Sequence, residues 1–247
     1  MPFDSARARA VLLDIEGTTT PISFVYRTLF PFAAAHVEQF LERHSDDREV
    51  RELIQELRRQ READARNSTD LPLWNENSTN DHLRSAAAYV RYLIERDSKI
   101  TPLKSLQGRI WEAGYRQGKL RGEVYPDVAP AFARWRAQGR RIAIFSSGSV
   151  LAQKLLFAHS TSGDLTGFIS GFFDTSTGPK REAHSYRRIA GALSHTSAEV
   201  LFISDVTAEL DGACSAGMQT ALSLRPEVNR PAELVHPSIE TFDQVFP

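Results

Sequence analysis

Two acidic residues, Asp14 and Glu16, stand two positions apart directly after the short apolar run Val11–Leu13. In an open parallel sheet, ligands bind beyond the carboxyl ends of the strands, so a carboxylate placed there can reach a substrate or a metal ion. A carboxylate is ionised at neutral pH and can act as a nucleophile without a partner base. An acid at a strand end is also a common turn or helix cap, so the role of Asp14 depends on its companions.

Those companions follow two further apolar runs. Ser146 and Ser147 follow the run 142–145 and offer hydroxyl and backbone N–H groups to an anion, although serines there also cap helices. Asp205 follows the run 200–203, and Lys180 lies in a Gly-Pro-Lys segment before that run. A lone lysine in a loop is usually a solvated surface charge. Together, however, these residues form a specific pattern of acid pair, hydroxyl, lysine and acid.

The composition is that of an ordinary globular protein and narrows the function classes. The 247 residues include 30 basic and 31 acidic side chains, a balance that argues against a nucleic-acid-binding protein. The sequence contains no signal-peptide pattern and no apolar run of membrane-spanning length. The single cysteine, Cys214, cannot form an intrachain disulfide and suits a reducing compartment. We therefore expect a cytoplasmic protein, a monomer, with neither nucleic acid nor a membrane as partner.

Short apolar runs separated by helical patterns predict the elements that position these residues. Strands are expected at 11–13, 142–145, 200–203 and 220–224. A further strand is expected near 168–173, although the glycines of that segment do not favour a strand. This alternation predicts an α/β fold with a Rossmann-like, doubly wound parallel sheet.

Residues 21–124 contain no convincing strand and predict an all-helical insert. The expected organisation is a first core piece at 1–20, the helical domain at 21–124, and the remainder of the core at 125–247. Ser78 followed by Asp81 resembles a capping box, and Thr101 before Pro102 fits an N-cap followed by a first-turn proline.

Four segments carry a resemblance to a known family: Asp14–Val25 (DIEGTTTPISFV), Leu106–Tyr115 (LQGRIWEAGY), Phe145–Phe157 and Ser204–Glu209. From about residue 10 to residue 224, the chain resembles the haloacid dehalogenase (HAD) superfamily of phosphohydrolases. Within that superfamily it looks like the enolase-phosphatases, or acireductone synthases, of methionine salvage. Most superfamily members carry Asp at the second acidic position, whereas this subfamily and this chain carry Glu.

The resemblance implies a Mg²⁺-dependent bifunctional enzyme with a HAD-like core and a helical cap. Its substrate would be a phosphorylated diketone, 5-methylthio-2,3-dioxopentyl phosphate, which is enolised and then dephosphorylated to acireductone. Asp14 would be the nucleophile, with Glu16 and Lys180 as further catalytic residues. One Mg²⁺ per subunit would be held by Asp14, Glu16 and Asp205. Charge balance also favours a cation, because like charges about 4 Å apart repel by about 4 kcal/mol at an effective dielectric of about 20.

Substrate-binding residues are expected from both parts of the chain. Ser146, Ser147 and Lys180 would hold the phosphoryl group. In the cap, Gln107, Trp111 and Tyr115 form a stripe along one predicted helix. A packing role is favoured for Trp111. Gln107 is the better candidate for substrate binding, because an amide at the edge of an apolar face needs a hydrogen-bond partner.

Several alternatives stay open at this point. The base that abstracts the proton during enolisation could be Glu16, Lys180 or Tyr115, and Glu16 could bind the metal by its side chain or its backbone carbonyl. Glu209 could orient a metal-bound water or simply occupy the first turn of a helix, where acids are favoured. The alternative function is a generic sugar- or glycolate-phosphate phosphatase. A binding module without turnover is disfavoured by the intact acids, and a serine hydrolase by the lack of a Gly-x-Ser-x-Gly elbow.

Overall fold

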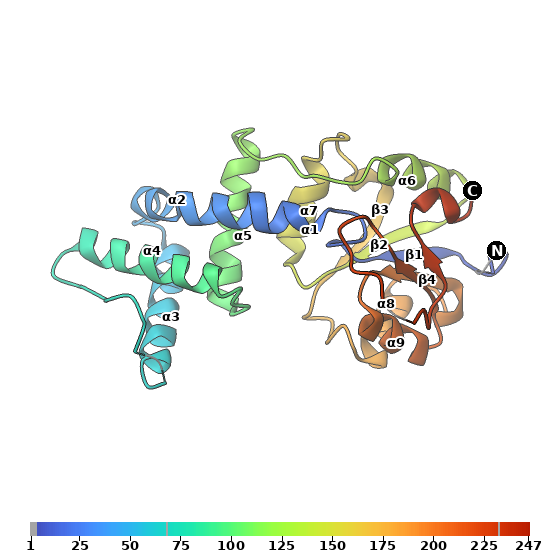
Figure 1. Cartoon of the computed structure of the whole chain (residues 1–247). Helices are drawn as coiled ribbons and strands as arrows, with labels where there is room; N and C mark the ends of the chain where they lie inside the picture. The colour runs from blue at the N-terminus through green and yellow to red at the C-terminus, as the bar shows by residue number, and fades with distance from the viewer. Residues whose placement is uncertain (1–3, 68, 232) are drawn as a thin grey trace. The chain divides into compact units, whose positions relative to one another are not determined.

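The computed structural model describes residues 4–67, 69–231 and 233–247 of the chain. Its strands form one parallel sheet in the order β3-β2-β1-β4-β5-β6 (Figure 1). The strands are β1 (Ala10–Leu13), β2 (Arg141–Phe145), β3 (Ile169–Phe173), β4 (Val200–Ser204), β5 (Gln219–Ser223) and β6 (Ser238–Ile239). The first five strands confirm the predicted ones, and their ends differ from the predicted ends by at most one residue. The two-residue β6 was not predicted, because so short a strand leaves no apolar run.

The register of the sheet aligns the ends of its central strands. Leu13 at the end of β1 lies opposite Ile144 of β2 on one side and Ile203 of β4 on the other. The residues that follow these three strands therefore leave the sheet at one edge. The chain order reverses between β1 and β4, which makes this boundary the switch point where open α/β sheets bind ligands.

Apolar residues cover both faces of the sheet, as parallel strands require. All four residues of β1 are buried. Helices α8 (Ala183–Ala192) and α9 (Thr207–Ser215) cover one face, and α6 (Val128–Ala137) and α7 (Val150–Ala158) cover the other (Figure 1). On the first face, the ring of Tyr186 packs between Phe145 and Phe202, with centroids 5.6 and 5.0 Å away. On the second, Phe132 packs against Phe157 at 6.2 Å.

The chain forms two compact units. The core unit contains the described residues up to Val25 together with Arg121–Pro247, and the helical unit is Tyr26–Leu120. As predicted, the described part of the helical unit contains no strand. Its helices are α2 (Phe30–Arg43), α3 (Arg48–Asp64), α4 (Thr79–Glu95) and α5 (Thr101–Arg116); a short α1 (Ile22–Phe24) and a π-helical turn (Val25–Leu29) precede them. The division into domains 1–20, 21–124 and 125–247 stays a prediction.

The helical unit packs the apolar faces that the sequence predicted. Leu103, Leu106 and Ile110 of α5 are all buried. Trp111 is also buried, and its indole Nε1 donates to the carbonyl of Leu29 at 2.9 Å, which supports its packing role. None of the described helices of the chain combines the length and the apolarity needed to cross a membrane.

The two predicted caps in this unit need correction. Ser78 caps α4 by accepting from the Asp81 backbone N–H at 3.1 Å, but the Asp81 carboxylate accepts from the Ser78 hydroxyl at 2.7 Å, so the reciprocal capping-box bond is missing. Thr101 is not the N-cap of α5. The carbonyl of Ile100 already accepts from the Lys104 N–H at 3.1 Å, so the helix begins one residue earlier than predicted.

Candidate active site

Asp14 lies at the end of the central strand and is buried. Its Oδ1 accepts from the backbone N–H of Ile15 at 2.8 Å and pairs with Nζ of Lys180 at 2.7 Å. Its Oδ2 lies 3.1 Å from the hydroxyl of Ser204. Both carboxylate oxygens are thus held, and a fixed orientation is what a nucleophile or metal ligand requires.

The segment Asp14–Thr20, which we call the catalytic loop, turns sharply after β1. The carbonyl of Ile15 accepts from the N–H groups of Thr18, Thr19 and Thr20, at 3.1, 2.9 and 2.9 Å. Gly17 has a φ of +68°, and a Cβ at this position would clash with the Asp205 carboxylate. The loop backbone therefore passes directly against Asp205, and glycine satisfies both the positive φ and the close approach.

Lys180 is a buried group of the site, and its alternative interpretation as a surface charge is wrong. Its Nζ bridges Asp14 Oδ1 and Glu209 Oε2, at 2.7 and 2.6 Å. The Tyr186 hydroxyl donates to the Lys180 carbonyl at 2.5 Å and fixes its backbone. Burial lowers the pKa of Lys180, but the Asp14 and Glu209 carboxylates outweigh burial and raise the pKa above its ordinary value. The side chain is therefore a permanent cation at neutral pH.

Glu209 and Ser204 complete the contacts of that lysine. Glu209 stands in the first turn of α9, and it also accepts from Lys180, so its position serves more than the helix dipole. The Ser204 hydroxyl lies 3.1 Å from carboxylate oxygens of both Asp14 and Glu209 and accepts from the Val206 N–H. Sequence reasoning did not single out Ser204. Its position at the end of β4, next to Asp205, was the available signal.

The side chains of Glu16 and Ser146 meet at the ends of β1 and β2. The Ser146 hydroxyl lies 3.4 Å from Glu16 Oε2 and accepts from the Gly148 N–H at 3.1 Å. Burial, and then the Asp14 charge, raises the pKa of Glu16. Ser147 is exposed, and the cap of α7 is supplied by Ser149. Of the serine cluster, the structure thus brings Ser146 to the acidic residues.

The site carries an excess of negative charge that a divalent cation would offset. Burial, and then the neighbouring Asp14 carboxylate, raises the pKa of Asp205 to about 7 and that of Glu209 to about 8. Among the described residues, no three His, Cys, Asp or Glu side chains form a ready-made metal cage. Mg²⁺ commonly uses only one or two protein carboxylates and completes its shell with water and substrate phosphate. The hard oxygen donors of Asp14 and Asp205 therefore fit this ion.

Gln107 and Tyr115 lie on α5 of the helical unit, where both are buried. Burial raises the pKa of Tyr115, so its phenol is neutral at physiological pH. Gln107 stays a predicted substrate-binding residue, and Tyr115 stays one of the candidate bases.

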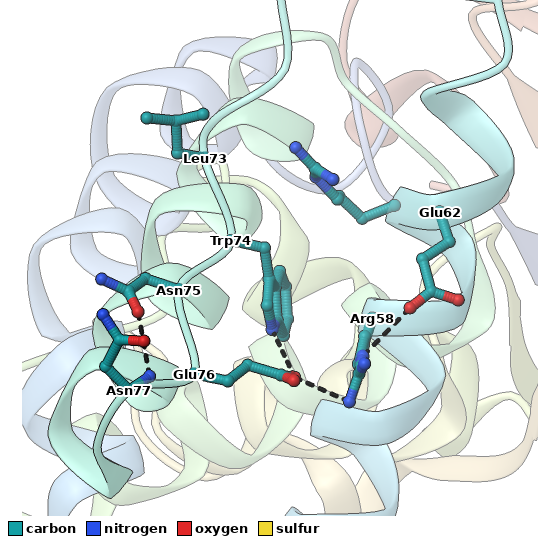
Figure 2. Close-up of a pocket in the computed structure, with 8 residues that line it drawn as sticks. Arg58, Glu62, Leu73, Trp74, Asn75, Glu76 and Asn77 are labelled. Carbon is teal, nitrogen blue, oxygen red and sulfur yellow. Dashed lines mark hydrogen bonds and ion pairs between the residues drawn. The ribbon is translucent and has the colours of Figure 1, made fainter.

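A pocket of about 460 Å³ in the helical unit offers a contrasting environment (Figure 2). Two arginines and two glutamates line it: Arg58 contacts Glu62 at 3.0 Å and Glu76 at 2.6 Å, and Arg61 donates to the carbonyl of Pro72 at 3.0 Å. The Trp74 indole donates to Glu76 at 3.2 Å. No excess of one charge remains there, unlike at the end of β1. The chemistry therefore concentrates at the carboxyl edge of the sheet.

Comparison with known proteins places the chain in a family. A family model for haloacid dehalogenase-like hydrolases matches residues 8–217. The "Enolase-phosphatase E1" of Synechococcus elongatus is 51% identical over 87% of this chain and 88% of its own length, and that of Sorangium cellulosum is 48% identical over 97% and 98%. The crystal structure of the UTR4 protein of Saccharomyces cerevisiae, 33% identical, matches with a TM-score of 0.77 over 96% of this chain and 100% of that one.

Proposed function

The chain belongs to the haloacid dehalogenase-like hydrolase family and, within it, is an enolase-phosphatase, and we propose how its residues share that reaction. The proposed substrate is 5-methylthio-2,3-dioxopentyl phosphate, which is enolised and then hydrolysed to acireductone (1,2-dihydroxy-3-keto-5-methylthiopentene) and phosphate in methionine salvage. The observation that supports the residue assignments is the bridge from Asp14 through Lys180 to Glu209, beside Asp205 at the carboxyl edge of the sheet.

Asp14 is the proposed nucleophile for phosphate release. One of its carboxylate oxygens attacks phosphorus, the bond from phosphorus to the enol oxygen breaks, and water then hydrolyses the aspartyl-phosphate. The permanent charge of Lys180 offsets the repulsion between the incoming phosphate dianion and the carboxylate. Ser146 and Ser147, at the end of β2, are proposed to hold phosphoryl oxygens.

Mg²⁺ is the proposed cofactor, with Asp14, Glu16 and Asp205 as its ligands. When bound, it supplies positive charge for the phosphoryl group and polarises a substrate carbonyl, which acidifies the adjacent C–H. Glu16 would contribute its backbone carbonyl, because its carboxylate already lies against Ser146 at 3.4 Å.

Glu16 is also the favoured base for enolisation. Lys180 holds its proton because two carboxylates raise its pKa, and burial keeps Tyr115 protonated, so neither is a ready proton acceptor at neutral pH. Burial raises the pKa of Glu16 and makes it a stronger base when it is ionised. The same raised pKa suits a group that returns a proton to the leaving enol oxygen.

The helical unit is proposed to act as the cap, with Gln107 as a substrate-binding residue. An amide can donate to a substrate oxygen and accept from an enol hydroxyl, as a diketone and its enol both require. The protein is further proposed to be a cytoplasmic monomer, and its balanced charge argues against a nucleic-acid or membrane partner.

The test of this function is direct. Purified protein with Mg²⁺ is mixed with the synthetic diketone phosphate, enol formation is followed by ultraviolet absorbance, and released phosphate is measured. Glucose 6-phosphate and phosphoglycolate serve as comparison substrates. A marked preference for the diketone phosphate, with enol appearing before phosphate, is expected. Equal or faster hydrolysis of the comparison substrates would replace the proposal with the generic phosphatase.

A further inference from the structure

Two side chains that have no role in the proposed reaction hydrogen-bond to the backbone of the catalytic loop. The Ser223 hydroxyl, at the end of β5, donates to the carbonyl of Gly17 at 3.0 Å. Nε of Arg225 donates to the carbonyl of Thr18, also at 3.0 Å. Both side chains are buried, with relative exposures of 1% and 4%. The loop that carries Asp14 is thus hydrogen-bonded at two consecutive carbonyls to the end of β5 and the segment directly after it.

Arg225 is itself held on several sides. Its Nη1 pairs with Asp127 Oδ2 at 2.7 Å and donates to the Glu240 carbonyl at 3.1 Å. Its guanidinium carbon lies 4.4 Å from the ring centroid of Tyr125 and 4.5 Å from that of Phe242. A planar guanidinium can direct Nε to one acceptor and Nη1 to another at once, whereas a lysine ammonium is a single point on a flexible stem. The geometry therefore uses what distinguishes arginine from lysine.

Asp127 holds this arginine in place. The same oxygen that pairs with Arg225 also accepts from the backbone N–H of Phe242 at 2.6 Å. The carboxylate thus links the start of α6, the C-terminal segment and the arginine. Such a network keeps the guanidinium in one orientation, and so keeps the loop carbonyl in one place.

We propose that Arg225 is a positioning residue for phosphate release, a proposal that rests on the function proposed above. With Ser223, it fixes Gly17 and Thr18, so that the loop backbone stays against Asp205 while Asp14 faces the phosphoryl group. Gly17 leaves no room between loop and Asp205, so a shift of the loop displaces that carboxylate. Misplacement of a reacting group by about 1 Å can cost about a hundredfold in rate.

The matched variants are Arg225→Lys and Arg134→Lys. Arg134 also donates to backbone carbonyls of the core unit, Phe242 at 2.7 Å and Phe246 at 3.0 Å, but it holds the C-terminal segment and not the catalytic loop. Arg225→Lys keeps a charge opposite Asp127 and loses the directed bond to Thr18. Ser223→Ala removes the other fastening without touching a charge, so it serves if Arg225→Lys folds poorly.

Two measurements decide the proposal. In Arg225→Lys, kcat for an aryl phosphate should fall between about tenfold and a hundredfold with KM within about twofold, while Arg134→Lys keeps its kcat. Amide hydrogen exchange should rise at residues 17–20 in Arg225→Lys and in Ser223→Ala, and near the C-terminal residues in Arg134→Lys. Unchanged exchange at 17–20, or equal losses of kcat in both lysine variants, would overturn the positioning role.

Failure of the proposed function gives a different result. If the wild-type protein hydrolyses no phosphate ester, the functional proposal falls, and the exchange measurement still decides whether Arg225 holds the loop. If the wild type hydrolyses the aryl phosphate and ignores the diketone phosphate, only the substrate assignment changes.

Discussion

Lys180 Nζ lies 2.7 Å from Asp14 Oδ1, a buried contact between an ammonium and the carboxylate at the end of the central strand. The contact joins the segment after β3 to the end of β1. It fixes the orientation of Asp14, and in the proposed reaction it supplies positive charge where a phosphate dianion approaches the carboxylate.

Replacement of that lysine is expected to damage phosphate release strongly. Lys180→Ala should lower kcat/KM by about a hundredfold to a thousandfold, because a preorganised charge facing the phosphoryl group is lost. Lys154→Ala is the control, since Lys154 is an exposed lysine of α7. Steady-state phosphate release measures both, and a Lys180→Ala enzyme as active as the control would exclude the assigned role.

Asp14→Asn should abolish phosphate release, because an amide is a far weaker nucleophile than a carboxylate and a poor Mg²⁺ ligand. Enol formation should survive in part if carbonyl polarisation does not need Asp14. Single-turnover assays with the diketone phosphate resolve the two steps. Near wild-type phosphate release by this variant would remove Asp14 as the nucleophile.

Removal of divalent metal should abolish both enol formation and phosphate release. Without a divalent cation, Lys180 alone would offset the repulsion between an incoming phosphate and the Asp14 and Asp205 carboxylates. Protein treated with EDTA, with metal loss verified by elemental analysis, should regain activity on addition of Mg²⁺. Undiminished phosphate release by verified metal-free protein contradicts the cofactor assignment.

Gly17→Ala isolates the close approach of the loop to Asp205. Gly118 has the same φ of +68°, and a Cβ added there would meet open space, so Gly118→Ala measures the backbone strain alone. That strain is about 1–2 kcal/mol for a residue with a Cβ. Gly17→Ala should carry the same strain and in addition lose most phosphate release, because its Cβ displaces the carboxylate. Denaturant unfolding and activity, measured side by side, separate the two effects; equal activity in both variants would mean that the approach is dispensable.

Gln107→Ala tests substrate selection by the helical unit. A hydrogen bond to a neutral partner contributes about 0.5–1.5 kcal/mol, so turnover of the diketone phosphate should fall about twofold to twelvefold. Hydrolysis of a small aryl phosphate should stay unchanged. Gln117→Ala, an exposed position at the end of the same helix, is the control. Equal losses on both substrates would leave Gln107 with a packing role.

Much of the site could be predicted because the sequence marks the ends of the strands. An apolar run followed by an acid or a hydroxyl marks where the chain leaves a parallel sheet, and register then brings Asp14, Ser146 and Asp205 to one edge. Lys180 belongs to a loop, whose path no periodicity describes. Its inclusion rested on the family pattern, and the structure supplies the contacts.

Other features could not be read from the sequence. Ser223 ends β5 and Arg225 follows it. Both donate to backbone carbonyls of a loop far away in the chain, so neither has a recognisable spacing to its partner. The start of α5 was misplaced by one residue, because the backbone bond from Lys104 to Ile100 competes with a threonine cap and leaves no mark in the residue types. Reciprocal caps similarly depend on rotamers, as Ser78 shows.

The central place of β1 in the sheet has a consequence for synthesis on the ribosome. β1 is made first, yet its neighbours β2 and β4 are made only as residues 141–145 and 200–204 emerge. Contacts of such high sequence separation form slowly and late. The contacts inside residues 26–120, by contrast, can all form once Leu120 has emerged from the ribosome. The nascent chain thus carries an unpaired, wholly apolar strand ahead of a helical unit, and that strand needs shielding from other chains until β4 arrives.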